Sequence, residues 1–152
     1  MSIYEVTDKL LPQISSKKYD FILLNYANPD MVGHTGNVEA AAKAVEAVDE
    51  CLKKVTEETL KADGAVVVTA DHGNCDVMKN LLTGEVDKEH SINPVPFIMI
   101  SNKTKNGHID ENFDISLLSP VGVLSDVSTT VLNLLGLEKP EEMTGMDLMG
   151  CI

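Results

Sequence analysis

The stretch AVVVTADHGN, residues 65–74, constrains the fold of this chain more than any other. Its first five residues form a short uninterrupted apolar run that favours a β-strand, and the run leads directly into Asp71, His72, Gly73 and Asn74. Such runs are typical of strands covered on both faces in the parallel sheets of α/β proteins. Ligands of these sheets bind at the carboxyl ends of the strands, so we expect Asp71 and His72 to lie at a site.

Other apolar stretches predict the elements around this strand. Residues 21–24 and 97–100 indicate two further strands. Between residues 38 and 62, apolar side chains recur three or four positions apart, which predicts a long amphipathic helix. Strand, helix and strand then follow one another from residue 19 to residue 70, which predicts a right-handed βαβ unit in an α/β fold. Shorter helices are predicted at residues 4–16 and 126–136.

Composition limits the classes of partner. A length of 152 residues with 43% hydrophobic content predicts a single domain over residues 1–152. The net charge of −12 argues against nucleic acid or an anionic membrane surface as a partner, because both require clustered positive charge. All 12 basic residues are lysines, so the chain has no guanidinium group with which to clamp a phosphate in two-pronged fashion.

The cysteines and the amino terminus predict a cytoplasmic protein. The three cysteines are widely spaced and odd in number, which favours reduced thiols over a disulfide framework. Among them, Cys75 is interpreted as a small buried residue rather than a soft metal ligand. The first residues include two acidic side chains and no apolar core of a signal peptide, and no run is long enough to span a membrane.

Candidate metal ligands fall in three places beside the predicted strands: Asp30 with His34, Asp71 with His72, and His90. Two carboxylates and three imidazoles suit Zn, Mn or Fe better than Ca or Mg. Asp30 and His34 are one helical turn apart, so a short turn there would aim both at one point. Taken singly, such an Asp is usually a cap and such a His a surface residue; their joint position at strand ends favours a metal site. By contrast, His108 is interpreted as a solvated loop residue.

Three motifs, NYANPDMVGHTG at 25–36, TADHGN at 69–74 and HSINPVPF at 90–97, closely resemble the cofactor-independent phosphoglycerate mutases of the alkaline phosphatase superfamily. The opening SIYEVTDKL and the later GVLSDVSTTVLNLLGLEKPEEMTG are also similar to that family, so the resemblance covers nearly the whole chain except residues 102–119. TADHGN alone would also fit the related phosphopentomutases, whereas NPDMVGHTG favours the mutases.

The resemblance implies a fold, a metal centre and a reaction. It implies a three-layer, mostly parallel sheet flanked by helices, present here in incomplete form. Asp30, His34 and His90 match the ligands of one metal ion, and Asp71 and His72 match two ligands of a second. The expected ions are manganese, with zinc as the alternative. In that family a transiently phosphorylated serine passes the phosphoryl group between 2-phosphoglycerate and 3-phosphoglycerate.

Parts of the family's machinery have no counterpart in these residues. The nucleophilic serine, a further Asp ligand and the substrate domain rich in Arg and Lys are missing, and Ser91 stands outside the nucleophile motif. No catalytic residue is therefore predicted, and the isolated chain is expected to be inactive, since loss of a nucleophile costs on the order of 10⁴-fold in rate. One alternative is a non-catalytic metal-binding or assembly module that self-associates through an exposed sheet edge, and another is a fragment of a related phosphopentomutase-type enzyme.

Overall fold

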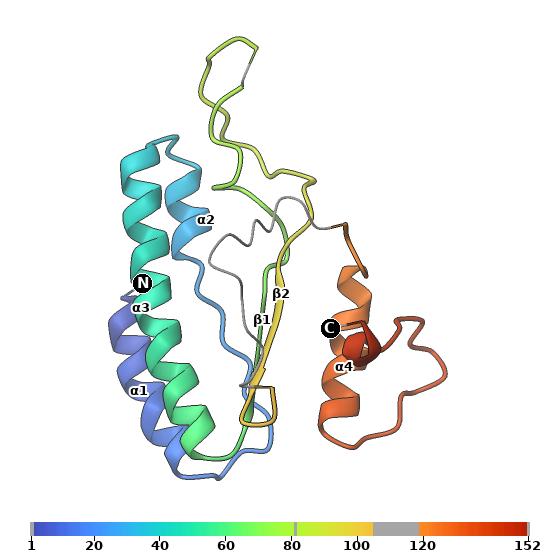
Figure 1. The fold of residues 1–152 in the computed structure, drawn as a ribbon. Coiled ribbons are helices and arrows are strands. Elements are labelled where there is room, and N and C mark those ends of the chain that lie inside the picture. Colours follow the sequence, from blue (N-terminus) through green and yellow to red (C-terminus); the bar gives the residue numbers. More distant parts are fainter. Residues whose placement is uncertain (1, 81, 105–118, 152) are drawn as a thin grey trace. The chain divides into compact units, whose positions relative to one another are not determined.

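The computed structural model describes residues 2–80, 82–104 and 119–151, and Figure 1 traces their course. The chain divides into two compact units, Met1–Gly107 and His108–Ile152, and each is described here by itself. The prediction of one domain over the whole chain stays a prediction. His108, interpreted from the sequence as a loop residue, lies outside the described residues.

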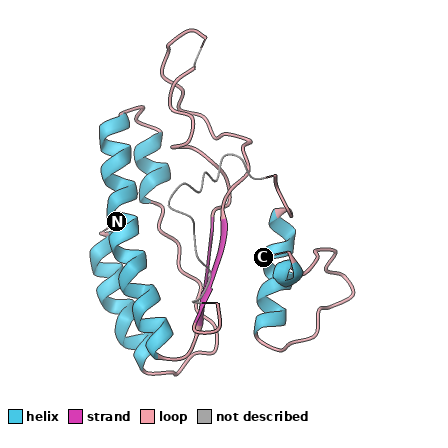
Figure 2. Cartoon of the chain, viewed as in Figure 1, coloured by secondary structure: helices cyan, strands magenta, loops and turns pink. Residues whose placement is uncertain are grey.

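Two long helices pack side by side in the first unit (Figure 2). Helix α1 (Ile3–Ser15) begins at Ser2, whose hydroxyl accepts the Glu5 N–H. Helix α3 (Val38–Lys61) begins at Asn37, whose side chain accepts the Ala40 N–H. Both helices confirm the periodicity of the sequence. The two helices contribute four of the buried apolar side chains of the chain: Ile3, Ala41, Cys51 and Val55.

The expected strand at residues 21–24 is not formed. Residues 20–27 connect α1 to the next helix without strand structure, and Phe21 and Leu23 are exposed to 53% and 85%. Strand formation needs a neighbour that takes up the backbone N–H and C=O groups, and among the described residues no strand pairs with this segment. The predicted βαβ unit is therefore wrong for the part of the chain that the structure describes.

Strands β1 (Ala65–Thr69) and β2 (Phe97–Ser101) pair antiparallel, with Ala65 opposite Ser101 and Thr69 opposite Phe97. We expected parallel neighbours. In its described residues the connection between the two strands contains turns and isolated bridges but no crossover helix. Parallel strands need such a crossover, whereas antiparallel strands do not. Both ends of β1 are exposed and its three valines are half-buried, so the expected cover on both faces is also absent. The third predicted strand is confirmed as β2.

A short hairpin interrupts the connection between the two strands. Lys79 and Val86 form an isolated antiparallel bridge, and the Asp87 N–H donates to the Met78 carbonyl. At the tip Gly84 has φ +73°, a conformation that glycine adopts without strain. The hairpin rises clear of the helices in Figure 1.

The second unit is built around helix α4 (Leu124–Leu134) and the short 3-10 helix η2 (Leu148–Gly150). The Asp126 carboxylate accepts the N–H groups of Val123 and Met146, both at 2.8 Å, and thereby ties the start of α4 to the later chain. These N–H groups hold the pKa of Asp126 below its ordinary value. None of the described helices is both long and apolar enough to cross a bilayer.

Candidate metal centre

A single turn of helix brings Asp30 and His34 together. Helix α2 (Asn28–Gly33) has Pro29 at its start, where the missing N–H costs nothing. Asp30 lies in the first turn and His34 directly follows the helix, its N–H donating to the Asp30 carbonyl at 3.1 Å. The two side chains consequently point to one place, as the spacing in the sequence predicted.

His90 reaches the same place from the segment after the hairpin. The same segment also contacts the residue that follows α2, because His34 Nδ1 lies 2.7 Å from the Lys88 carbonyl oxygen. A carbonyl oxygen can only accept, so Nδ1 carries the proton and donates. In the neutral ring Nε2 then keeps its lone pair, which is the form that binds a metal.

The three ligand atoms form a nearly equilateral triangle. Asp30 Oδ1 lies 3.3 Å from His34 Nε2 and 3.2 Å from His90 Nε2, and the two nitrogens are 3.1 Å apart. An ion about 2.1 Å from each atom would see them at angles of about 95–105°, between the values of octahedral and tetrahedral sites. The triangle therefore fits one face of the coordination shell of a divalent transition metal.

Asn74 supports the carboxylate of this triangle. Its side chain, only 6% exposed, donates from Nδ2 to Asp30 Oδ1 at 2.9 Å. Desolvation acts to raise the pKa of Asp30, but the Asn74 amide and the nearby imidazoles of His34, His90 and His72 outweigh it and lower that pKa. The carboxylate is thus kept in the charged form that a cation requires.

The other predicted pair is only partly drawn into the cluster. The His72 ring stacks on the His90 ring, with centroids 3.7 Å apart and planes 16° apart. The Asp71 side chain is 84% exposed, and its Oδ1 lies 3.7 Å from His72 Nε2. Among the described residues, only Asp30, His34 and His90 gather their ligand atoms within 4.8 Å of one another. Asp71 and His72 as ligands of a second ion stay a prediction.

Cys75 lies beside this cluster but binds elsewhere. Its Sγ is 3.1 Å from the Pro29 carbonyl oxygen, to which the thiol donates, and its side chain is partly buried. Burial, followed by the carboxylates of Asp30 and Asp76, raises the pKa of the thiol. All three cysteines are free, which agrees with the absence of a disulfide framework expected from their spacing.

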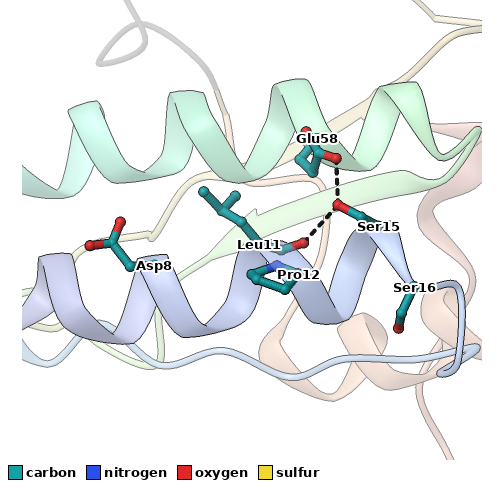
Figure 3. A pocket seen from close by; sticks show the side chains of 6 residues that line it. All are labelled: Asp8, Leu11, Pro12, Ser15, Ser16 and Glu58. Atoms are coloured by element: carbon teal, nitrogen blue, oxygen red, sulfur yellow. Dashed lines mark hydrogen bonds between the residues drawn. The ribbon is translucent and has the colours of Figure 1, made fainter.

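A separate pocket between α1 and α3 does not have the chemistry of a metal centre. Figure 3 shows its lining side chains, in which Ser15 Oγ donates to Glu58 at 2.6 Å. That bond and the neighbouring Lys61 lower the pKa of Glu58. The lining contains the two carboxylates of Asp8 and Glu58 but no imidazole, and we interpret the bond as a tie between the helices.

Comparison with known proteins agrees with a metal-dependent function. Residues 1–139 match the metalloenzyme superfamily. The chain belongs to that superfamily. A 2,3-bisphosphoglycerate-independent phosphoglycerate mutase of Clostridium acetobutylicum is 52% identical over 148 residues, which are 97% of this chain and 27% of the relative. The corresponding mutase of Clostridioides difficile is 48% identical over 149 residues, 98% of this chain and 28% of that protein.

A solved structure shares the fold of this chain. The phosphoglycerate mutase of Leishmania mexicana, crystallised at low cobalt concentration, matches with a TM-score of 0.77 and 32% identity over 95% of this chain and 27% of that one. The α/β class and the resemblance to the cofactor-independent mutases are confirmed. The chain spans little more than a quarter of the length of the curated relatives that it matches.

Sequence reasoning missed the role of Asn74, although this residue ends the TADHGN motif. The available signal was its place two residues after His72, in a segment already expected to hold a site. A buried amide in such a segment must satisfy its hydrogen bonds, and a ligand carboxylate is a suitable partner.

Proposed function

We propose that this chain forms the metal-binding portion of a cofactor-independent phosphoglycerate mutase, an isomerase of glycolysis that interconverts 2-phosphoglycerate and 3-phosphoglycerate. The observation that carries the proposal is the triangle of Asp30 Oδ1, His34 Nε2 and His90 Nε2, with sides of 3.1–3.3 Å. The relatives named above, each at about half identity, support the assignment of the reaction. A cytoplasmic location belongs to the same proposal.

Within this function, Asp30, His34 and His90 hold one divalent ion, and Asp71 and His72 contribute to a second. Manganese is the proposed metal and zinc the alternative, because a mixed carboxylate and imidazole site accepts both. When bound, such ions neutralise phosphoryl oxygens and lower the pKa of a nucleophilic hydroxyl. The protein's own part is to keep Asp30 charged through Asn74 and to present Nε2 of His34 through its bond to Lys88.

The first test is the binding of Mn²⁺ by the purified chain, measured by titration calorimetry. Asp30→Asn should weaken binding at least 10-fold, because the central carboxylate of the triangle is lost. Asp87→Asn is the matched control, because it removes the same charge from the hairpin segment. There the Asp87 Oδ1 accepts the Glu89 N–H. A wild-type chain that binds neither Mn²⁺ nor Zn²⁺ would refute the assignment, and so would equal affinities of the two variants for Mn²⁺.

The second test is the reaction itself. We expect no interconversion of the two phosphoglycerates by the 152-residue chain, because the residues of the chain include no match to the family's nucleophilic serine. Activity that survives Ser91→Ala would contradict this expectation, since it would require another nucleophile within the chain.

A second candidate function, self-association, is favoured by the segment of residues 20–27. Its apolar Phe21, Ile22 and Leu23 side chains are exposed, and no described strand pairs with it. The proposed partner is a second copy of the same segment, and the two copies would pair through their backbone N–H and C=O groups. Sedimentation velocity over a range of concentrations should show a dimer that Leu23→Lys abolishes; a strict monomer counts against this function.

A further inference from the structure

Asp76 is the acceptor at the centre of a second hydrogen-bond cluster near the triangle. Its Oδ2 accepts from Ser91 Oγ at 2.7 Å and from Asn93 Nδ2 at 2.8 Å. Partial desolvation acts to raise its pKa, but these two bonds and the backbone N–H groups of Asp76 and Val77 lower it. One exposed carboxylate therefore binds the side chains of both Ser91 and Asn93.

Asp76 contacts residues that adjoin the two imidazoles in the chain. Ser91 follows His90 directly, and Gly73 follows His72 directly. The Ser91 N–H donates to the Gly73 carbonyl at 2.9 Å, which makes a bridge between the two segments. The Asp76 carboxylate lies against this bridge, where a Cβ on Gly73 would come within 2.6 Å of Asp76 Oδ1 and 2.2 Å of Ser91 Oγ.

The arrangement of these groups links the two histidines. The residues that directly precede this Gly73–Ser91 bridge are His72 and His90, and their rings stack at a centroid distance of 3.7 Å. Besides the bridge, the side chain of Asp76 restrains the segment of His90 through Ser91 and Asn93. Loss of the Asp76 side chain would let the segment of His90 move relative to the segment of His72.

We infer that Asp76 is a positioning residue which, through Ser91, holds His90 in place beside His72 and toward Asp30 and His34. The inference rests on the proposed metal-binding function and adds to it a residue outside the predicted ligand set. It assigns to Ser91 a structural hydroxyl rather than a nucleophilic one.

The test combines a metal-free and a metal-bound measurement on the same variants. Asp76→Asn and Ser91→Ala remove the carboxylate and the hydroxyl of one hydrogen bond, and Asp87→Asn serves as the charge-matched control. The histidine ring signals in the NMR spectrum of the metal-free chain report the ring stack. Calorimetry with Mn²⁺ and the visible absorption of bound Co²⁺ report affinity and coordination geometry.

We expect both test variants to shift the ring signals of His72 and His90, to weaken Mn²⁺ binding about 10-fold and to change the Co²⁺ spectrum. The double variant should lose no more affinity than the greater of the two single losses, because the Ser91–Asp76 bond that Ser91→Ala removes is one of the bonds that Asp76→Asn disturbs. The control should leave the ring signals and the spectrum unchanged.

Two results would overturn the inference. The first is an Asp76→Asn variant that matches the control in all three measurements. The second applies if Asp76→Asn does not fold: a folded Ser91→Ala variant with wild-type ring signals then decides against it. A wild-type chain that binds neither Mn²⁺ nor Zn²⁺ refutes instead the proposed function, and the ring signals still decide whether Asp76 holds the stack.

Discussion

Gly33→Ala should disturb the proposed metal centre through Asn74. Gly33 is buried at the end of α2, and a Cβ there would lie 2.1 Å from Asn74 Oδ1, whereas ordinary contact begins at 3.4 Å. Asn74 would have to retreat by more than about 1 Å, which would break its 2.9 Å bond to Asp30. Alanine gains up to about 1 kcal/mol of helix propensity, but overpacking costs about 1–3 kcal/mol and the lost bond to a carboxylate about 1.5–3 kcal/mol.

The expected net effect of Gly33→Ala is therefore a loss of about 1.5–5 kcal/mol in the free energy of unfolding, with Mn²⁺ affinity reduced about 10-fold. Urea unfolding and calorimetry measure the two quantities. Gly150→Ala is the control, because a Cβ there would meet nothing within 4 Å. In an Asn74→Ala background, Gly33→Ala should cost much less. A Gly33→Ala chain as stable as the wild type, with unchanged affinity, would refute the reasoning.

Three further predictions concern stability. Thr130→Val should lower the free energy of unfolding by about 1–3 kcal/mol in urea, because it removes the acceptor of the buried Leu148 N–H. The folded-state pKa of Asp126 is lowered, so its stabilisation is full above the ordinary Asp value of about 3.9 and is lost as pH falls through the lower folded value. Asp126→Asn should therefore flatten the acid dependence of the melting temperature, and an unchanged dependence would contradict this. Mn²⁺ at 100 times its Kd should stabilise the chain by about 2.7 kcal/mol in a thermal melt, and a chelator or Asp30→Asn should abolish the gain.

The helices could be predicted from sequence because their signals are local. The apolar spacing of α3 and the Asn37 cap lie within one stretch of chain, so no distant contact is needed to define them. The strands were harder. Residues 21–24 have the composition of a strand but become one only if a neighbour takes up their backbone groups, and composition does not show whether that neighbour is present.

Three of the five predicted ligands, Asp30, His34 and His90, lie together in the structure, but the sequence did not define their geometry. Asp30 and His34 share one turn, and that spacing alone placed them together. The approach of His90 depends on contacts across more than fifty residues, such as that of His34 with Lys88, which no local pattern encodes. Asp76 was overlooked for the same reason, since its partners Ser91 and Asn93 follow it at a distance in the chain.

The hairpin tip near Gly84 is a suitable place to attach a spectroscopic probe. A Cβ at Gly84 would meet nothing within 4 Å, and the neighbouring Leu82 is 97% exposed, while the bridge of Lys79 with Val86 closes the hairpin below them. A spin label or fluorophore attached at position 82 would therefore lie outside the ligand framework. From there it could report the arrival of a paramagnetic ion by distance-dependent relaxation or quenching.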